Sequence, residues 1–131
     1  MSTVWHLTDS GTWMQAQVRG VFRESTRGVL IEQVGFLHGS YADQLALVAS
    51  FVYRDVTGPM VALGIEPELL VQHGLEVREE AGAPDDPTPF PHVYGGDLPL
   101  AVITKAIPVT VTDGILEGWE PRQPPHDRLK A

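Results

Sequence analysis

Apolar residues recur at two different periods along the chain, and this pattern predicts a protein that mixes strands with helices. Continuous apolar runs at residues 4–7 and 60–65 predict strands, and the second run is typical of a strand covered on both faces. Apolar and charged residues alternate over residues 75–79, which predicts a half-exposed strand. The β-branched residues of 100–111 predict a further strand, in which Pro108 has to mark an edge, a bulge or a break because proline has no backbone N–H.

The strongest helical pattern lies between residues 40 and 54. Apolar residues there occupy nearly every side of a helix, which is typical of a buried element. Ser40 is followed three positions later by Asp43, a spacing similar to that of a capping box. We therefore expect a central buried helix over residues 40–54 that begins at Ser40.

Three shorter segments carry local signals of helix ends or turns. Asp9 and Ser10 are favoured N-cap residues and Gly20 suits a C-terminal stop, so a helix of about two to three turns is expected between them. Pro67 fits the first turn of another short helix. Residues 29–34 could form a strand or a short helix, and we favour a helix or a turn.

Two segments rich in proline and polar residues are expected to lack regular structure. Residues 81–89 contain three prolines, two aspartates and a glycine, which predicts a loop. Residues 118–131 predict a loosely ordered C-terminal tail. No regular alternation of strand, helix and strand runs through the remainder. The prediction is therefore a single α+β domain over residues 1–117, with a strongly twisted, curved sheet that is mostly antiparallel or mixed.

The composition narrows the class of protein. The chain has 131 residues, 43% of them apolar, which is enough for one domain with a core of its own. Because it has no cysteine, disulfides, thiolate nucleophiles and cysteine zinc sites are excluded, and this fits a reducing compartment. The formal charge of −8 disfavours nonspecific binding to nucleic acid. No signal peptide or membrane-spanning run is recognised, so we expect a cytoplasmic protein.

Three of the five histidines lie at the ends of predicted strands or loops, next to glycine or proline. They are His6, His38 and His92. We expect their rings to converge on one cleft, because a small apolar domain has little other reason to place three histidines in this way. Two alternatives stay open. Each histidine could be a hydrogen-bonded structural group, or the three could bind zinc, although no two of them have helical metal-ligand spacing.

Polar residues near these histidines are further candidates. Tyr94 follows His92 on a backbone held between a proline and two glycines, and its ring could also simply pack. Helix capping would explain Ser40 fully, and Gln44, one turn beyond it, could lie on the surface or in the pocket. Standard catalytic signatures are missing: the chain has no glycine-rich phosphate loop with a lysine, no nucleophile elbow, and no carboxylate placed by sequence to orient a serine–histidine pair.

Three polar motifs have an order and spacing that match a known family. They are Trp5-His6-Leu7-Thr8, Gly35-Phe36-Leu37-His38-Gly39-Ser40 with Gln44, and Phe90-Pro91-His92-Val93-Tyr94-Gly95. Together they resemble the domain-of-unknown-function family 952, a bacterial family, from about residue 3 to about residue 107. The chain departs from that family in two places. Gly39 stands where the family usually has cysteine, and Gly96-Asp97 lengthens the turn after Tyr94.

The resemblance implies a fold and a ligand. The family is grouped with ADP-ribosyltransferase-like domains, which have a split, curved sheet around an NAD cleft. By this resemblance His6 would contact a ribose hydroxyl of NAD, and a tyrosine ring could stack on nicotinamide. Such transferases usually need a glutamate near the reacting carbon, and no glutamate stands in a matching motif. Glu76, Glu79 and Glu80 lie in or just after a charged strand and are expected in solvent.

The resulting hypothesis is a cleft that binds a small molecule, either a nucleotide or an NAD-like ligand. The predicted catalytic residues are His38, His92 and Tyr94. The predicted ligand-binding residues are His6, Thr8, Ser40 and Gln44, and no metal is assigned. The chemistry would be transfer of an ADP-ribosyl or phosphoribosyl group. The alternatives are a non-catalytic binding or regulatory module, and histidines that are purely structural.

Overall fold

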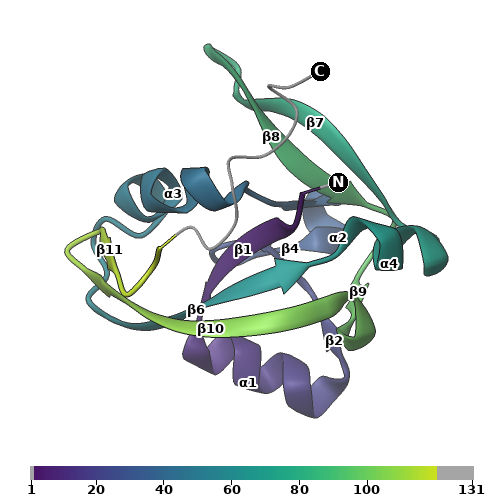
Figure 1. The fold of residues 1–131 in the computed structure, drawn as a ribbon, viewed down its shortest axis with the longest axis horizontal. Helices are drawn as coiled ribbons and strands as arrows, with labels where there is room; N and C mark the ends of the chain where they lie inside the picture. Colours follow the sequence, from purple (N-terminus) through teal and green to yellow (C-terminus); the bar gives the residue numbers. More distant parts are fainter. Residues whose placement is uncertain (1, 121–131) are drawn as a thin grey trace.

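A four-stranded antiparallel sheet forms the centre of the protein (Figure 1). The computed structural model describes residues 2–120. The strand order is β1-β6-β10-β11, and each neighbouring pair is antiparallel. The strands are β1 (Val4–Asp9), β6 (Gly58–Ile65), β10 (Ile103–Thr112) and β11 (Ile115–Glu117).

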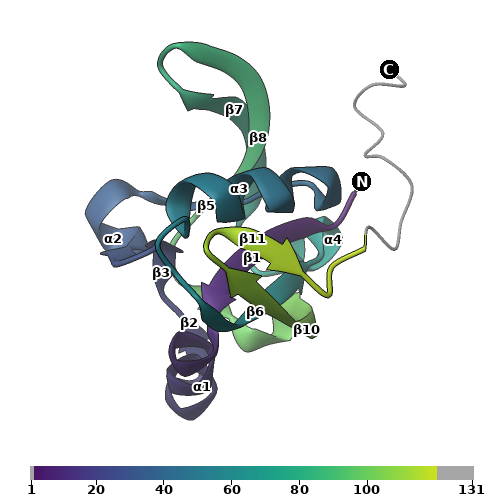
Figure 2. The same cartoon turned by 90° about the vertical axis from the view of Figure 1, so that its left-hand side faces the viewer.

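Strand β6 separates two apolar cores. Residues 60–65 are all buried. Because successive side chains of a strand point to opposite faces, Leu63 joins one core and Ala62 joins the other. Helices α1 (Ser10–Arg19) and α3 (Leu45–Val52) lie on opposite faces of the sheet (Figure 2). The prediction of a strand covered on both faces is confirmed.

Helix α1 begins and ends where the sequence predicts. The Asp9 carboxylate accepts a hydrogen bond from the backbone N–H of Thr12 at 2.7 Å, which caps the first turn. Gly20 ends the helix with a φ of 93°, in the left-handed region, and its N–H donates to the carbonyl oxygen of Ala16 at 2.8 Å. These caps place α1 directly after the strand that carries His6.

A second antiparallel sheet carries two of the three histidine motifs. Its order is β5-β8-β7. A backbone bridge joins it to β1: the Trp5 N–H donates to the Ser40 carbonyl at 2.7 Å, and the Ser40 N–H donates back at 2.8 Å. The bridge brings His6 close to His38. The strands are β5 (Phe36–His38), β7 (Glu76–Ala83) and β8 (Asp86–Tyr94).

Short elements connect these two sheets. The predicted short helix that begins at Pro67 is confirmed. Residues 29–34, predicted as helix or turn, start as strand and continue as helix. The paired short strands are β2 (Val21–Phe22) with β9 (Leu98–Pro99), and β3 (Glu24–Thr26) with β4 (Val29–Leu30). The short helices are α2 (Ile31–Val34), η1 (Ala42–Gln44), α4 (Pro67–Gln72) and η2 (Leu100–Val102).

The predicted central helix over residues 40–54 is wrong in both length and burial. Ser40 lies in the bridge to β1 instead of capping a helix, and α3 begins only at Leu45, after η1. One side of α3 is open: Leu47 is 44% exposed and Phe51 is 70% exposed. The segment is apolar nearly all round because its outer side chains line a cavity, while its inner side packs in the core.

Residues 81–89, predicted as a loop, instead belong to a β-hairpin. Strands β7 and β8 continue through them and meet at a tight turn. Pro89 and Pro91 occupy alternate positions of β8, so their nitrogens face the same side of the strand. Away from β7 this part of β8 has no paired strand, so no ladder hydrogen bond is lost. Pro108 likewise lies beyond the residues of β10 that pair with β11, at an edge as predicted.

Near the end of the described chain, Trp119 packs on the body of the protein. Its ring meets Trp5 edge-to-face with centroids 4.8 Å apart, and its Nε1 donates to the carbonyl oxygen of Ala42 at 3.0 Å. The predicted loose tail otherwise falls on residues 121–131, which lie outside the described residues.

The fold class follows from these pairings. The protein is α+β, with a curled antiparallel sheet and few helices, as predicted. The hairpin of β7 and β8 extends away from the body in Figure 2. Within residues 2–120 no helix is long and apolar enough to cross a membrane.

Gly39 is expected to tolerate no side chain. A Cβ there would lie 2.4 Å from the carbonyl oxygen of Pro91 and 2.5 Å from Cγ1 of Val4. Gly39→Ala should lower the free energy of unfolding by about 1–3 kcal/mol, because the backbone of β8 has to move. Gly58→Ala, whose Cβ meets nothing within 4 Å, is the matched control. Chemical denaturation compares the two, and equal midpoints would contradict the close packing at Gly39.

Candidate functional site

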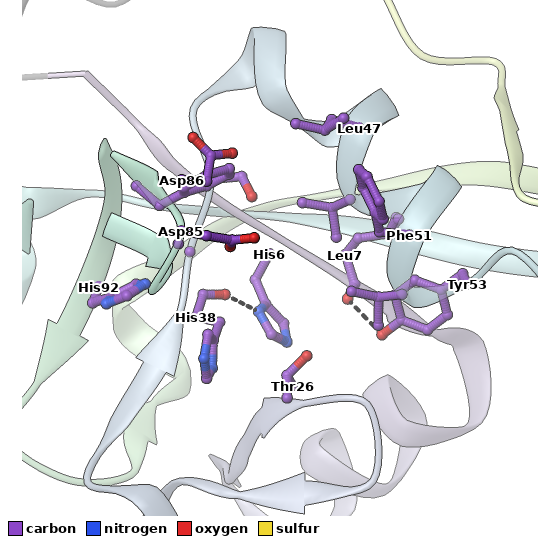
Figure 3. A pocket seen from close by; sticks show the side chains of 16 residues that line it. His6, Leu7, Thr26, His38, Leu47, Phe51, Tyr53, Asp85, Asp86 and His92 are labelled. Atoms are coloured by element: carbon purple, nitrogen blue, oxygen red, sulfur yellow. Dashed lines mark hydrogen bonds between the residues drawn. The ribbon is translucent and has the colours of Figure 1, made fainter. Parts of the chain in front are cut away.

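A cavity of about 630 Å³ opens between helix α3 and the β7–β8 hairpin (Figure 3). This volume lies within the range of roughly 300–1,000 Å³ that is typical of small-molecule sites. His6, His38, His92 and Ser40 all line it. The structure therefore brings the three predicted histidines together on one cavity.

The positions of His38 and His92 follow from the register of β5 and β8. The pairing places Phe36 opposite Tyr94 and His38 opposite His92. Side chains alternate along a strand, so these four share one face of the sheet while the intervening Leu37 is buried in the core. Cross-strand partners on one face are close enough to interact directly.

Phe36 is the platform on which the polar rings pack. Its centroid lies 4.5 Å from His92 and 4.6 Å from His38, and the His92 ring is stacked on it at 23°. The ring of Tyr94 is also stacked on Phe36, at 5.2 Å. The His38 and His92 rings are themselves 5.2 Å apart. These contacts restrain both imidazoles before any ligand is bound.

His38 is held in one tautomer by Ser25. The Ser25 hydroxyl donates its single hydrogen to the carbonyl oxygen of Phe36, and its oxygen lies 3.0 Å from His38 Nδ1. That oxygen can only accept from the ring, so His38 Nδ1 carries the hydrogen and Nε2 keeps a lone pair. Burial lowers the pKa of His38, and the neighbouring His92 and His6 lower it further. The ring is therefore favoured as a neutral base.

A carboxylate holds His92 in the same tautomer. Glu80 Oε1 accepts from His92 Nδ1 at 2.8 Å and from the Tyr94 hydroxyl at 2.6 Å. The bond from Tyr94, followed by the bond from His92, lowers the pKa of Glu80, and the bond to Glu80 raises the pKa of Tyr94. Because Glu80 is an acceptor, His92 Nδ1 has to donate, and in the neutral ring Nε2 then has a lone pair.

Among the hydrogen bonds of residues 2–120, neither the Nε2 of His38 nor the Nε2 of His92 has a protein partner; only their Nδ1 atoms are engaged. In the described part of the chain, Trp5 Nε1 is the only fully buried side-chain nitrogen or oxygen that lacks a hydrogen bond. Both Nε2 atoms therefore keep accessible surface, and both residues line the cavity. The site presents two adjacent, oriented acceptors. Among residues 2–120 no three His, Cys, Asp or Glu side chains are arranged to hold a metal ion.

His6 differs because both of its ring nitrogens already face protein oxygens. Nδ1 lies 2.8 Å from the carbonyl oxygen of His38, and Nε2 lies 3.2 Å from Glu24 Oε1. Both partners are acceptors, an arrangement that an imidazolium satisfies with one donated hydrogen bond on each side. The hydroxyl of Thr8 donates to the same carboxylate oxygen at 2.6 Å. His6 thus contributes its ring to the cavity wall and offers no free nitrogen.

The other four predicted site residues have different surroundings. Ser40 lines the cavity beside the bridge to β1. Thr8 is fully buried against a carboxylate, and the Gln44 amide binds two backbone groups at 2.9 and 3.0 Å. The guanidinium group of Arg78 lies over the Tyr94 ring, 4.2 Å from its centroid. The described lining of the cavity does not include Thr8, Gln44 or Tyr94. Each of these residues instead bonds to groups that support the cavity.

An apolar wall and an acidic mouth complete the cavity. Helix α3 contributes Phe51 and neighbouring aliphatic side chains. The hairpin contributes Phe90, whose ring lies against Gly82 so closely that a Cβ at Gly82 would come within 2.7 Å of it. Asp85 and Asp86, at the tip of the hairpin, also line the cavity (Figure 3). The cavity is thus basic at its histidine end, apolar along one side and acidic at the hairpin tip.

Sequence reasoning missed three partners of these histidines: Glu24, Ser25 and Glu80. Glu24 and Ser25 lie in a three-residue strand, which is too short for a periodic signal to show which side chain faces inward. Glu80 was expected in solvent; its side chain is 38% exposed, yet it accepts two hydrogen bonds. No glutamate was found by motif, and the structure shows that Glu24 is buried against His6.

The neutral state of His38 should make stability depend on pH. Burial lowers its folded-state pKa below 6.5, so the unfolded chain binds this proton more tightly. The stabilisation is complete above the unfolded pKa of 6.5 and is lost as pH falls from there through the lower folded pKa. The free energy of unfolding, measured from about pH 7.5 to about pH 5, should fall less steeply in His38→Gln than in the wild type. His73→Gln is the surface control, and an unchanged slope in His38→Gln would contradict the shift.

Glu80 should control the tautomer of His92. In Glu80→Ala the acceptor for Nδ1–H is gone, so the His92 ring should shift from its Nδ1–H form toward its Nε2–H form. Nitrogen-15 NMR of the imidazole distinguishes the two forms. Glu76→Ala, on the same strand but bonded to Arg78, should leave His92 unchanged. A wild-type ring that is already Nε2–H would refute the assignment.

Comparison with known proteins identifies the fold. The crystal structure of protein CC0527 from Caulobacter crescentus is similar with a TM-score of 0.69 and 23% identity, over 88% of this chain and 94% of that chain. The solution NMR structure of CC0527 is similar with a TM-score of 0.66 and 21% identity, over 90% of this chain and 93% of that chain. At this level of identity the likeness concerns the fold alone. None of the curated proteins compared with this chain matches it.

The family comparison covers most of the chain. The family model described as "Protein of unknown function (DUF952)" matches residues 7–106. The matched region contains the strands and loops that carry His38, Ser40, His92 and Tyr94, and it begins directly after His6. The chain therefore belongs to the DUF952 family of proteins of unknown function.

Proposed function

We propose that this protein binds a small hydroxylated ligand of the nucleoside type in the cavity between α3 and the hairpin. The observation that carries the proposal is the pair of Nε2 acceptors on His38 and His92, each set by a hydrogen bond at Nδ1. The two rings are neighbours, with centroids 5.2 Å apart, and we propose that they accept hydrogen bonds from two neighbouring hydroxyls, such as the vicinal diol of a ribose.

The remainder of the cavity suits the planar base of such a ligand. With the diol at the histidines, the base would lie along the apolar wall that includes Phe51 and Phe90. Aromatic side chains contribute large apolar area and favour packing against another ring. Most of the affinity would come from this wall, and the two imidazoles would supply orientation and specificity.

The same geometry suits proton transfer at a ligand hydroxyl. A neutral imidazole whose Nε2 meets a hydroxyl can act as a general base. The Glu80 carboxylate at Nδ1 would stabilise the imidazolium that forms on His92, and Ser25 would hold the orientation of His38. In this proposal His38 and His92 are the catalytic residues. Tyr94 is a positioning residue that acts through Glu80.

The residues of this cavity do not fit the pyrophosphate of NAD. Its described lining has no lysine or arginine, and it includes Asp85 and Asp86. Phosphate groups are usually bound by arginine, lysine or a helix N-terminus. Transfer of ADP-ribose would also need a carboxylate near the reacting carbon, whereas Glu24 lies behind His6 and is bonded to it. We derive no step through NAD, and phosphoribosyl transfer meets the same obstacle.

A non-catalytic binding module is the second candidate, and one observation favours it. His6, to which the family resemblance assigns the ribose contact, has both ring nitrogens engaged within the protein. A cavity with that contact closed could still bind a ligand through His38 and His92. Binding without turnover would favour this second candidate.

Removing either acceptor should weaken binding. His38→Gln and His92→Gln should each lower the affinity for adenosine, guanosine, uridine or nicotinamide riboside by about tenfold, since each removes a hydrogen bond worth about 1 kcal/mol or slightly more. Isothermal titration calorimetry with the wild type and each variant measures this. His73→Gln is the matched control, because that ring lies at the end of α4 and bonds to the backbone of its own helix.

The diol itself can be tested with the same variants. A 2′-deoxynucleoside should bind the wild type about tenfold more weakly than the ribonucleoside, and the difference should shrink in the variants that lack one acceptor. Equal affinities of the wild type and both variants for every nucleoside would reject the role of the histidine pair.

A further inference from the structure

The acidic mouth of the cavity points to a ligand class narrower than nucleosides in general. We infer that the cavity admits nucleosides that are uncharged or positively charged and rejects their 5′-phosphates. This inference rests on the proposed nucleoside pocket and adds the sign of the charge that the pocket selects. It follows from three features: the carboxylates at the hairpin tip, the position of the arginines, and the chemistry of the walls.

Asp85 and Asp86 make the mouth negative. Both line the cavity on the side of the hairpin (Figure 3). The Asp86 carboxylate accepts a hydrogen bond from the backbone N–H of Thr88 at 3.0 Å. That bond lowers the pKa of Asp86, so the group is ionised at neutral pH. A phosphate that entered past this tip would approach fixed negative charge.

Among residues 2–120 no arginine lines this cavity, although Arg27 lies beside it, over the ring of Tyr53. Arg27 is paired with a carboxylate at 2.6 Å, and Arg78 lies over the ring of Tyr94. Arg19 and Arg23 line a separate cavity of about 240 Å³. The described lining of the main cavity therefore offers no cation to a phosphate. The protein has basic side chains near the site, but they are not directed at this ligand position.

The opposite end of the cavity needs a ligand that donates hydrogen bonds. The His92 side chain lines the cavity and is only 5% exposed, and its Nε2 has no partner within the part of the chain that the structure describes. The lining of the same cavity also includes the rings of Phe51 and Phe90, whose faces attract cations. A ligand with hydroxyls at one end and a flat, uncharged or cationic ring matches all three surroundings. An anionic group matches none of them.

The test compares each nucleoside with its own 5′-monophosphate. Adenosine with AMP, and nicotinamide riboside with nicotinamide mononucleotide, are titrated calorimetrically into the wild type at low ionic strength. The affinity for each nucleoside should be at least about tenfold higher than the affinity for its monophosphate. Added salt should reduce this difference in affinity, because it screens the exposed aspartates.

Two variants separate the mouth from the overall charge of the protein. In Asp85→Asn/Asp86→Asn the preference for the nucleoside should shrink to about threefold or less, because the local repulsion is gone. Glu68→Gln/Glu117→Gln removes the same net charge from α4 and β11, whose residues do not line the cavity, and should keep the wild-type preference.

The outcomes distinguish this inference from the proposal beneath it. If nucleoside and monophosphate bind the wild type equally well, or the monophosphate binds better, the charge selection is overturned and the nucleoside pocket stands. If neither binds the wild type or the aspartate variant, both the pocket and its selectivity are rejected. Monophosphate binding that appears only in the aspartate variant supports the inference.

Discussion

The backbone bridge between Trp5 and Ser40 is the constraint on which the site depends. It is the contact that ties the three-stranded sheet to strand β1, with hydrogen bonds of 2.7 and 2.8 Å. Because His6 directly follows Trp5, the bridge also brings its ring to the carbonyl oxygen of His38. Gly39 allows the two backbones to approach, since a Cβ there would meet both β1 and β8. A small displacement at this junction would separate the histidines.

The three histidines differ in chemistry because they differ in partners. His6 has a protein oxygen at each ring nitrogen, the carbonyl of His38 at Nδ1 and the carboxylate of Glu24 at Nε2. His38 donates from Nδ1 to a hydroxyl, and His92 donates from Nδ1 to a carboxylate. In both rings Nε2 is left without a partner among the described residues. Identical side chains within one cavity therefore divide into one ring whose two nitrogens are both engaged within the protein and two rings whose Nε2 atoms have no protein partner among the described residues. Only the latter two are available to a ligand.

Charge around the cavity limits what that ligand can be. The protein as a whole has a formal charge of −8, and the hairpin tip adds Asp85 and Asp86 to the cavity itself. The similarity to CC0527 concerns the fold, so the ligand has to be argued from the lining of this chain. That lining combines histidines, aromatic rings and carboxylates, and these are the grounds on which we propose a hydroxylated, non-anionic ligand.

Local patterns in the sequence determined strand β6, the caps of α1 and the alternation that puts His38 and His92 on one face of their strands. They could not determine the hairpin over residues 81–89 or the open side of α3, because each depends on which neighbour covers an edge or a face. Ser25 and Glu80 lie 13 and 12 positions from their histidines, and these hydrogen bonds exist only once the strands are paired. The tertiary structure alone therefore decided which histidine nitrogens carry hydrogen and which are free to meet a ligand.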